Sequence, residues 1–162
     1  MSASNVFLDT NILVYSFDSH EPEKRERALA ALERLPHRVL STQVLLELYN
    51  VLTRKLLDTA AGQIADEIIE HLGFQTVIPA DARLVNQAVQ IAGRFHISIW
   101  DAMIVAAAKR GGCKEIWSED LSEGMVFDGV TVVNPFNSGG TPWGPAKGAS
   151  AQKGLQRHLT CT

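Results

Sequence analysis

The sequence predicts an α/β fold with a central, mainly parallel sheet of about five short strands, covered by helices on both faces. Two observations lead to this prediction. Short apolar runs that are typical of buried strands alternate along the chain with longer segments of helical periodicity. The chain has 162 residues, of which 46% are hydrophobic, so it is expected to build one domain around one core.

The first half of the chain is expected to form strands at residues 5–9 and 38–42 and helices at residues 10–17, 22–35 and 43–57. Both strands are apolar runs that end at small polar or acidic residues. Pro22 suits the first turn of the second helix, because the N–H that proline lacks has no partner there in any case. The third helix carries one apolar stripe at helical spacing, which indicates a buried side.

The second half is expected to form helices at residues 60–72, 81–95 and 97–110 and strands at residues 76–79, 114–117 and 129–133. Gly73 fits the position just past the first of these helices. The third helix is rich in alanine, has cations in its last turn and is followed by Gly111. We therefore expect residues 1–136 to form the domain. Residues 137–162 hold few residues that could fill a core, which predicts a flexible tail.

Composition argues against several classes of protein. With 15 Lys and Arg against 18 Asp and Glu, bulk positive charge cannot hold nucleic acid, and any such contact must be local. The two cysteines, Cys113 and Cys161, show no metal-ligand spacing, and the N-terminus lacks the pattern of a secretion signal. No apolar run approaches the length that spans a bilayer. We expect a cytoplasmic protein with no membrane partner.

Four acidic residues occupy positions where a parallel sheet gathers ligands. Asp9 and Asp120 follow expected strands, and ligands of open α/β sheets bind outside the carboxyl ends of the strands. Asp101 lies on the inner side of the Ala-rich helix, where an isolated carboxylate needs a partner. Glu47 lies at the margin of an apolar stripe. Each also has a simpler interpretation: Asp9 and Asp101 as helix caps, and Glu47 as a solvated side chain.

Taken together, the four carboxylates predict a metal site. Two carboxylates about 4 Å apart repel by about 4 kcal/mol at an effective dielectric constant of roughly 20, so a cluster needs cations. Oxygen ligands without clustered Cys or His indicate Mg²⁺ or Mn²⁺ rather than Zn²⁺. Such ions activate water and neutralise the charge that develops on a phosphodiester during in-line displacement.

These residues also resemble a known family. The motifs that carry the resemblance are Phe7-Leu8-Asp9-Thr10-Asn11, Glu47 after Ser41-Thr42, Trp100-Asp101-Ala102-Met103-Ile104-Val105-Ala106, and Ser118-Glu119-Asp120-Leu121 followed by Gly129-Val130 and Asn134-Pro135-Phe136. In this order they resemble the PIN domain, and more narrowly the VapC-type toxins of bacterial and archaeal toxin–antitoxin pairs. The resemblance covers roughly residues 5–136 and implies the three-layer fold of that family.

The resemblance implies a metal-dependent endoribonuclease that leaves 5′-phosphate and 3′-hydroxyl ends. The residues that match the family's acidic quartet, as catalytic residues and metal ligands, are Asp9, Glu47, Asp101 and Asp120. The residues that match the polar neighbours orienting these carboxylates are Thr10, Asn11 and Ser118. Glu119 is a further possible ligand, but we expect it to face water. The resemblance also implies a homodimer, an RNA substrate and a VapB-type antitoxin whose tail blocks the acidic groove.

Two other classes of function stay open at this point. A phosphatase with an aspartyl nucleophile would also place Asp after the first strand, but Asn11 takes the position of its expected proton donor. A non-catalytic PIN-like scaffold would keep the acidic pocket without using it for chemistry. Cleavage of RNA with Mg²⁺ or Mn²⁺ separates the enzyme from the scaffold, and an aspartyl-phosphate trapped at Asp9 would indicate the phosphatase.

Overall fold

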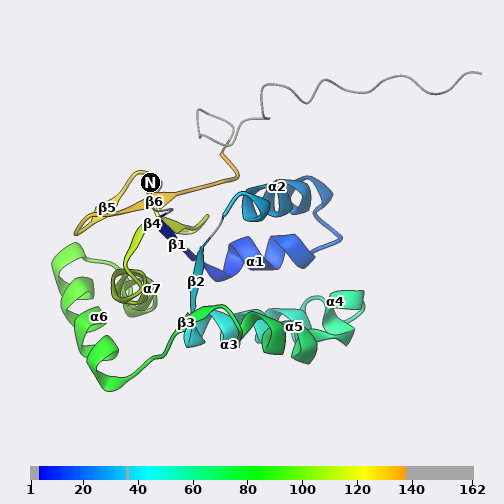
Figure 1. The fold of residues 1–162 in the computed structure, drawn as a ribbon, viewed down its shortest axis with the longest axis horizontal. Helices are drawn as coiled ribbons and strands as arrows, with labels where there is room; N and C mark the ends of the chain where they lie inside the picture. Colours follow the sequence, from blue (N-terminus) through cyan, green and yellow to red (C-terminus); the bar gives the residue numbers. More distant parts are fainter. Residues whose placement is uncertain (1–3, 36, 138–162) are drawn as a thin grey trace, which may run out of the picture.

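The computed structural model of the chain describes residues 4–35 and 37–137 (Figure 1). Its strands form one six-stranded sheet in the order β3-β2-β1-β4-β6-β5. The strands are β1 (Asn5–Leu8), β2 (Arg38–Ser41), β3 (Thr76–Ile78), β4 (Cys113–Trp117), β5 (Val126–Phe127) and β6 (Val130–Val133). All pairs are parallel except β5 with β6, which confirms the predicted mainly parallel sheet. The tail expected at residues 137–162 lies outside the described residues from residue 138 onward.

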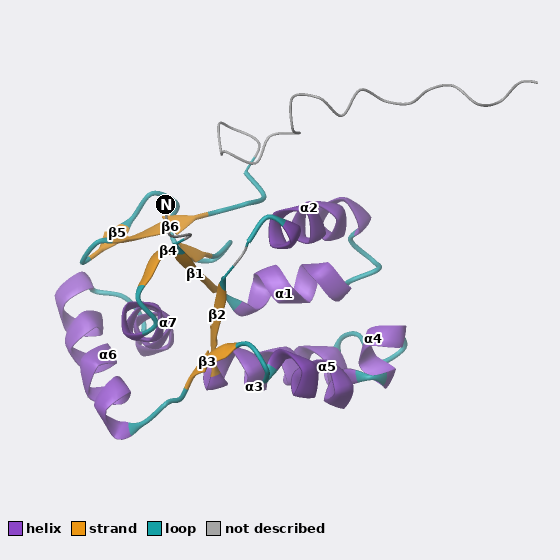
Figure 2. Cartoon of the chain, viewed as in Figure 1, coloured by secondary structure: helices purple, strands orange, loops and turns teal. Residues whose placement is uncertain are grey.

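Helices lie on both faces of this sheet, as the alternating pattern predicted. They are α1 (Thr10–Phe17), α2 (Pro22–Glu33), α3 (Thr42–Arg54), α4 (Ala60–Gln63), α5 (Ala65–Leu72), α6 (Ala82–Phe95) and α7 (Ile99–Arg110). Figures 1 and 2 show α6 and α7 on one side of the strands and α1 to α5 on the other. α7 packs on β2, β4 and β6, while α3 packs on β2 from the opposite side and contacts α1 and α5.

The order of the strands creates a crevice between β1 and β4. From β1 the chain moves outward to β2 and β3, then returns to place β4 on the other side of β1. The connections that leave the carboxyl ends of β1 and β4 therefore diverge. Such a switch point in strand order is where ligands of open α/β sheets bind. The pairing of the two strands continues to this edge, since the Asp9 N–H donates to the Trp117 carbonyl at 3.0 Å.

Two differences from the predicted elements have local causes. The helix expected at residues 60–72 is divided into α4 and α5 at Ile64. A Cβ atom at Gly62 would lie 2.1 Å from the Leu56 carbonyl oxygen, so this close approach of two backbones requires glycine and shapes the first of the two segments. The second difference is β5, which has two residues and exists through its pairing with β6 across the turn at Asp128 and Gly129, both at positive φ.

The core is built mainly from the strands and from the inner faces of the helices. Phe7, Trp117 and Phe127 are its largest fully buried side chains. Cys113 is also buried, at the start of β4, and burial raises the pKa of its thiol to about 12. In the described part of the chain no single helix is long and apolar enough to cross a membrane. α6 and α7 meet the length and composition criteria only as a pair, and the two are bent by 116°.

Candidate active site

Asp9 occupies the crevice at the end of β1 and is 4% exposed. It is the N-cap of α1, and its Oδ1 accepts from the Thr10 N–H at 2.7 Å. The interpretation of Asp9 as a helix cap is thus confirmed, but the cap uses one oxygen. The other oxygen, Oδ2, accepts from the Ser118 hydroxyl at 2.6 Å and from the Asn11 amide at 3.3 Å. The carboxylate therefore faces the segment after β4 as well as its own helix.

Asn11 and Ser118 tie the segment after β1 to the segment after β4. The Asn11 amide nitrogen donates to Asp120 Oδ2 at 3.0 Å as well as to Asp9, so these two carboxylates share one donor. Its carbonyl oxygen accepts from the Glu119 N–H at 3.2 Å. The buried Ser118 hydroxyl accepts from the Asp120 N–H at 3.1 Å while it donates to Asp9. Asp9 and Asp120 are consequently held within about two hydrogen-bond lengths of each other.

Glu47 reaches the same place from α3. Its Oε2 accepts from the Thr10 hydroxyl at 2.7 Å, and its Oε1 accepts from the Gln43 amide at 2.8 Å. The side chain is half-buried, and both of its carboxylate oxygens accept hydrogen bonds from protein groups, so Glu47 is not solely a solvated residue. Gln43 was not among the predicted site residues, although its position four residues before Glu47 on a helix is the spacing at which side chains meet.

The electrostatics of Asp9 reflect this crowding. Burial is the largest effect and raises the pKa of Asp9 from 3.8 to about 6; hydrogen bonds from Ser118 and Thr10 oppose it, while the charges of Asp120 and Glu47 raise it further. Within residues 4–35 and 37–137, no Lys, Arg or His forms an ion pair with Asp9, Glu47 or Asp120. The three carboxylates are separated by amide and hydroxyl donors rather than neutralised by cations.

Asp101, the fourth predicted acid, makes a different contact. It lies in the first turn of α7, where the N-cap Ser98 accepts from the Asp101 N–H at 3.1 Å and donates to its Oδ2 at 2.8 Å. Asp101 is therefore part of a capping arrangement, although the N-cap residue itself is Ser98. Since a two-residue link joins α7 to β4, α7 runs against the strand direction and begins toward the edge that carries Asp9. Among the described residues, no group of three or more His, Cys, Asp or Glu side chains stands in metal-binding array.

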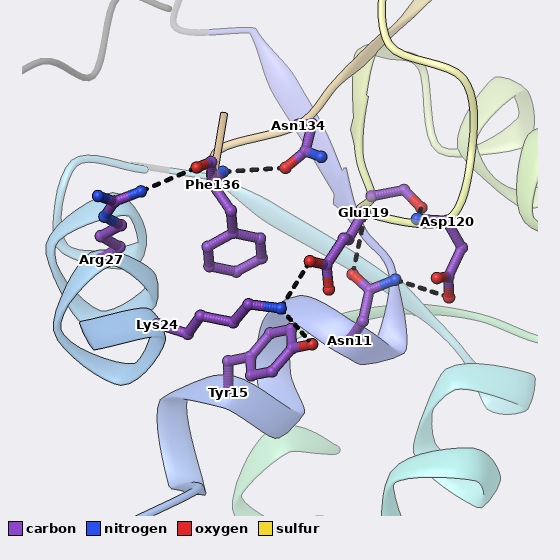
Figure 3. A network of polar contacts seen from close by, with 9 residues as sticks. Asn11, Tyr15, Lys24, Arg27, Glu119, Asp120, Asn134 and Phe136 are labelled. Carbon is purple, nitrogen blue, oxygen red and sulfur yellow. Dashed lines mark hydrogen bonds and ion pairs between the residues drawn. The ribbon is translucent and has the colours of Figure 1, made fainter. Parts of the chain in front are cut away.

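Glu119 was expected to face water; its side chain is 28% exposed, and its carboxylate is paired with a cation (Figure 3). Its carboxylate accepts from the Lys24 ammonium at 2.7 Å, and that ammonium also donates to the Tyr15 hydroxyl at 2.8 Å. Burial alone would raise the pKa of Glu119, but hydrogen bonds from Lys24 and Tyr15 and the charge of Lys24 hold it below its usual range. Lys24 and Tyr15 were missed by the sequence analysis, because no local pattern links α1 and α2 to the segment after β4.

A cleft of about 570 Å³ opens over these residues. It is lined by Thr10, Asn11, Val14, Tyr15, Asp18, Glu21, Glu47, Asn50, Val51, Lys55, Leu56, Glu119 and Asp120. We call this surface the acidic cleft. Buried Asp9 lies next to it, behind Thr10 and Asn11, which both line it.

A family model described as the PIN domain matches residues 6–122. The chain belongs to the PIN domain family. The match spans β1 to β4 and includes all eight residues that the sequence analysis proposed for the site. No curated protein sequence matches this PIN domain.

Several solved structures share the fold. A toxin–antitoxin complex from Klebsiella pneumoniae has a TM-score of 0.63 at 22% identity, over 81% of this chain and 98% of that chain. The VapC20 toxin of Mycobacterium tuberculosis, described as cleaving the sarcin–ricin loop, has a TM-score of 0.55 at 21% identity, over 71% and 91%. VapBC2 from Rickettsia felis, bound to a fragment of promoter DNA, has a TM-score of 0.57 at 16% identity, over 80% and 98%. At these identities the likeness is one of fold.

The donors in and beside the acidic cleft are of the chemical kind that suits a hard divalent cation, although their carboxylates do not stand in a metal-binding array in the described residues. Asp9, Glu47 and Asp120 offer carboxylate oxygens, the ligands that Mg²⁺ and Mn²⁺ prefer. The pKa of Asp9 is raised partly by its two acidic neighbours, so a cation placed among them would relieve a repulsion that the protein now carries. Asn11 and Thr10 already orient the facing oxygens, as the residues around metal ligands commonly do.

Proposed function

We propose that this PIN domain is a Mg²⁺- or Mn²⁺-dependent endoribonuclease and the toxin of a VapC-type toxin–antitoxin pair. The observation that carries the proposal is buried Asp9 at the switch point of the sheet, with Asp120 and Glu47 beside it and no ion pair on any of the three among the described residues. Such a site attracts a cation, and in a PIN domain that cation would serve phosphodiester hydrolysis.

Each residue then has a part in the reaction. Asp9, Glu47 and Asp120 would hold the ion, which when bound supplies an activated water and neutralises the charge developing on the phosphate. Asn11 keeps Asp9 and Asp120 at a fixed separation through its shared amide, while Thr10 aims the Glu47 carboxylate.

Two further residues complete the proposed site. Ser118 holds Asp9 from the side of β4. Asp101 is proposed as the fourth acid, because α7 begins toward the edge of the sheet that carries Asp9.

The proposed biological setting follows from the relatives. Several structures that share this fold are toxin–antitoxin complexes, which supports a VapB-type antitoxin as partner. The VapC20 toxin, described as cleaving the sarcin–ricin loop, supports RNA as substrate. We also propose a homodimer, since Leu46, Leu57 and Phe74 are each more than 60% exposed and offer apolar surface to a second copy. Size-exclusion chromatography with light scattering tests the dimer. The cytoplasm is the proposed location, since RNA substrates are found there.

The function is tested by incubating the full chain with a mixed RNA pool in Mn²⁺, in Mg²⁺ and in EDTA. We expect cleavage with either metal, none in EDTA, and a loss of about a thousandfold in Asp9→Asn. Asp128→Asn, which removes a carboxylate far from the acidic cleft, is the matched control. Ligation of the products to adaptors that require 5′-phosphate ends checks the chemistry. Cleavage that persists in Asp9→Asn would refute the assignment.

Asp101 needs its own test because it bonds to Ser98 in the structure. As a fourth acid of the site, Asp101→Asn should also abolish cleavage, while Ser98→Ala, which frees the carboxylate, should not. If Asp101→Asn cleaves RNA as the parent chain does, its role is limited to capping α7. If no metal supports cleavage in any variant, the non-catalytic scaffold is the better description, and an aspartyl-phosphate trapped at Asp9 would favour the phosphatase.

A further inference from the structure

Glu119 and Asp120 are neighbours in sequence but their carboxylates point to different partners (Figure 3). Asp120 accepts from the Asn11 amide, on the side of Asp9, whereas Glu119 turns toward α2 and accepts from Lys24. Both residues nevertheless line the acidic cleft. The course of the backbone would allow either carboxylate to reach a metal in the cleft. Which of the two does so depends on the groups that hold each side chain.

Lys24 is held in place from three directions. Its ammonium lies 2.7 Å from Glu119 Oε1 and 2.8 Å from the Tyr15 hydroxyl oxygen. It also lies 4.2 Å from the centroid of the Tyr15 ring and 5.9 Å from that of Phe136, a distance at which an aromatic face attracts a cation. The two rings pack edge to face with centroids 5.0 Å apart.

Phe136 is itself anchored on both sides of its backbone. Its N–H donates to the Asn134 side chain at 2.9 Å, and its carbonyl accepts from Arg27 of α2 at 2.9 Å. Tyr15, Phe136 and Lys24 thus form a binding site for the Glu119 carboxylate. Its three residues come from α1, the segment after β6 and α2 (Figure 3). An isolated ion pair on the surface contributes little, because two long side chains must be ordered to form it. Here the ammonium is already positioned by groups from three parts of the chain.

We propose that Lys24 is a positioning residue that keeps the Glu119 carboxylate out of the acidic cleft and leaves Asp120 as the acid of that segment. This inference rests on the proposed metal-dependent function. Without Lys24, Glu119 would lose its cation and keep only the Tyr15 hydroxyl, on the wall of a cleft that already holds Glu47 and Asp120. A divalent cation would then draw it in as an additional ligand.

The test measures Mn²⁺ affinity of the full chain by electron paramagnetic resonance, without RNA. Lys24→Met keeps the aliphatic stem over Tyr15 and frees Glu119, so we expect Mn²⁺ to bind about tenfold more tightly. Lys55→Met is the matched control, because Lys55 lines the same cleft and has no ion pair among the described residues. It removes the same charge without freeing a carboxylate, and about a twofold increase is expected.

Two more variants isolate the role of Glu119. In Lys24→Met with Glu119→Gln, which removes one charge of each sign, the affinity should return to about the parent level, and Lys24→Arg should retain the parent affinity. Glu119→Ala with Lys24 intact should change Mn²⁺ affinity by less than about twofold, because Glu119 is not a ligand while it is paired with Lys24. This variant tests the inference even if Lys24→Met does not fold.

Equal effects of Lys24→Met and Lys55→Met, or a loss of affinity of tenfold or more in Glu119→Ala, would overturn the inference. A parent chain that binds no Mn²⁺ would instead count against the proposed function. Failure of the inference and failure of the function are therefore distinguishable.

Discussion

Two hollows formed by the described residues have similar size and opposite character. The acidic cleft measures about 570 Å³, and a basic cavity on α6 and α7 measures about 620 Å³. The basic cavity is lined by Gln87, Gln90, Ile91, Arg94, Ala106, Lys109, Arg110 and Asp128. Its cations are all paired: Arg94 and Lys109 with Asp128 in the cavity wall, and Arg110 with Asp81 outside it. The two hollows differ little in volume. They differ in whether their charged side chains are paired with opposite charges.

Two carboxylates show how far the hollows differ. Burial next to other acids raises the pKa of Asp9 to about 6. Hydrogen bonds from Lys109 and Arg94 lower the pKa of exposed Asp128. The surroundings of Asp128 stabilise its ionised form. Those of Asp9 destabilise its ionised form, and a bound cation would offset that effect. Unfavourable electrostatic energy is therefore concentrated at Asp9 beside the acidic cleft, and not in the slightly larger basic cavity.

The largest expected effect is on stability as a function of pH. Because the pKa of Asp9 is raised from 3.8 to about 6 on folding, the stability that its protonated form contributes is complete below about pH 4 and lost as pH rises through 6. This amounts to about 3 kcal/mol. Urea unfolding of the parent chain and Asp9→Asn from pH 4 to pH 7 should therefore diverge in favour of the variant. Parallel curves would mean that Asp9 carries no such cost.

Metal should stabilise the acidic cleft by a slightly smaller amount. At a Mn²⁺ concentration about a hundredfold above Kd, binding adds about 2.7 kcal/mol, which raises Tm by roughly 5 to 10 °C. Differential scanning fluorimetry should show this rise in the parent chain and in Asp128→Asn, but not in Asp9→Asn. An equal rise in all three would place the metal elsewhere.

Removing the shared amide should weaken metal binding without removing a carboxylate. Asn11→Ala takes away the donor that Asp9 and Asp120 have in common, so Mn²⁺ affinity should fall by about ten- to a hundredfold in a calorimetric titration. Asn50→Ala is the control, because Asn50 lines the same cleft without a hydrogen bond to these acids. Comparable losses in both variants would contradict the role given to Asn11.

The smallest effect is expected in the basic cavity. Asp128→Asn breaks two exposed ion pairs, which contribute little when solvent screens them, so Tm should move by at most about 2 °C at pH 7. The lowered pKa of Asp128 means that its contribution is present at neutral pH and lost on acidification, the opposite direction to Asp9. RNA cleavage within about twofold of the parent chain completes the contrast.

The fold was largely predictable because it depends on local patterns. The apolar runs and the caps placed β1 and α1 nearly to the residue, and Pro22 marked the start of α2. β5 was missed because two residues carry no periodicity and become a strand only through pairing with β6. The division between α4 and α5 at Ile64 was missed because the apolar periodicity of residues 60–72 runs through it without a proline or glycine at the break.

The site was predictable in part. Asp9 and Asp120 follow strands, and the position of a strand end in sequence is also its position at the edge of the sheet. The partners of Glu119 were not predictable, since Lys24 lies 95 residues away and carries no signal that distinguishes it from the other charges of α2. Asp101 shows the converse, because it was expected on the inner side of α7 but is only partly buried and bonds to Ser98 in the first turn.

The reactivity of Cys113 reports on local opening of β4, the strand that leads into the acidic cleft. Cys113 lies at the opposite end of β4 from Ser118, and as a buried thiol with a pKa near 12 it cannot react with a maleimide while the strand is in place. In a Cys161→Ser chain it is the sole thiol, since the sequence holds two cysteines. Its labelling rate would then measure how readily β4 opens locally, and the rates with and without Mn²⁺ in the solution can be compared.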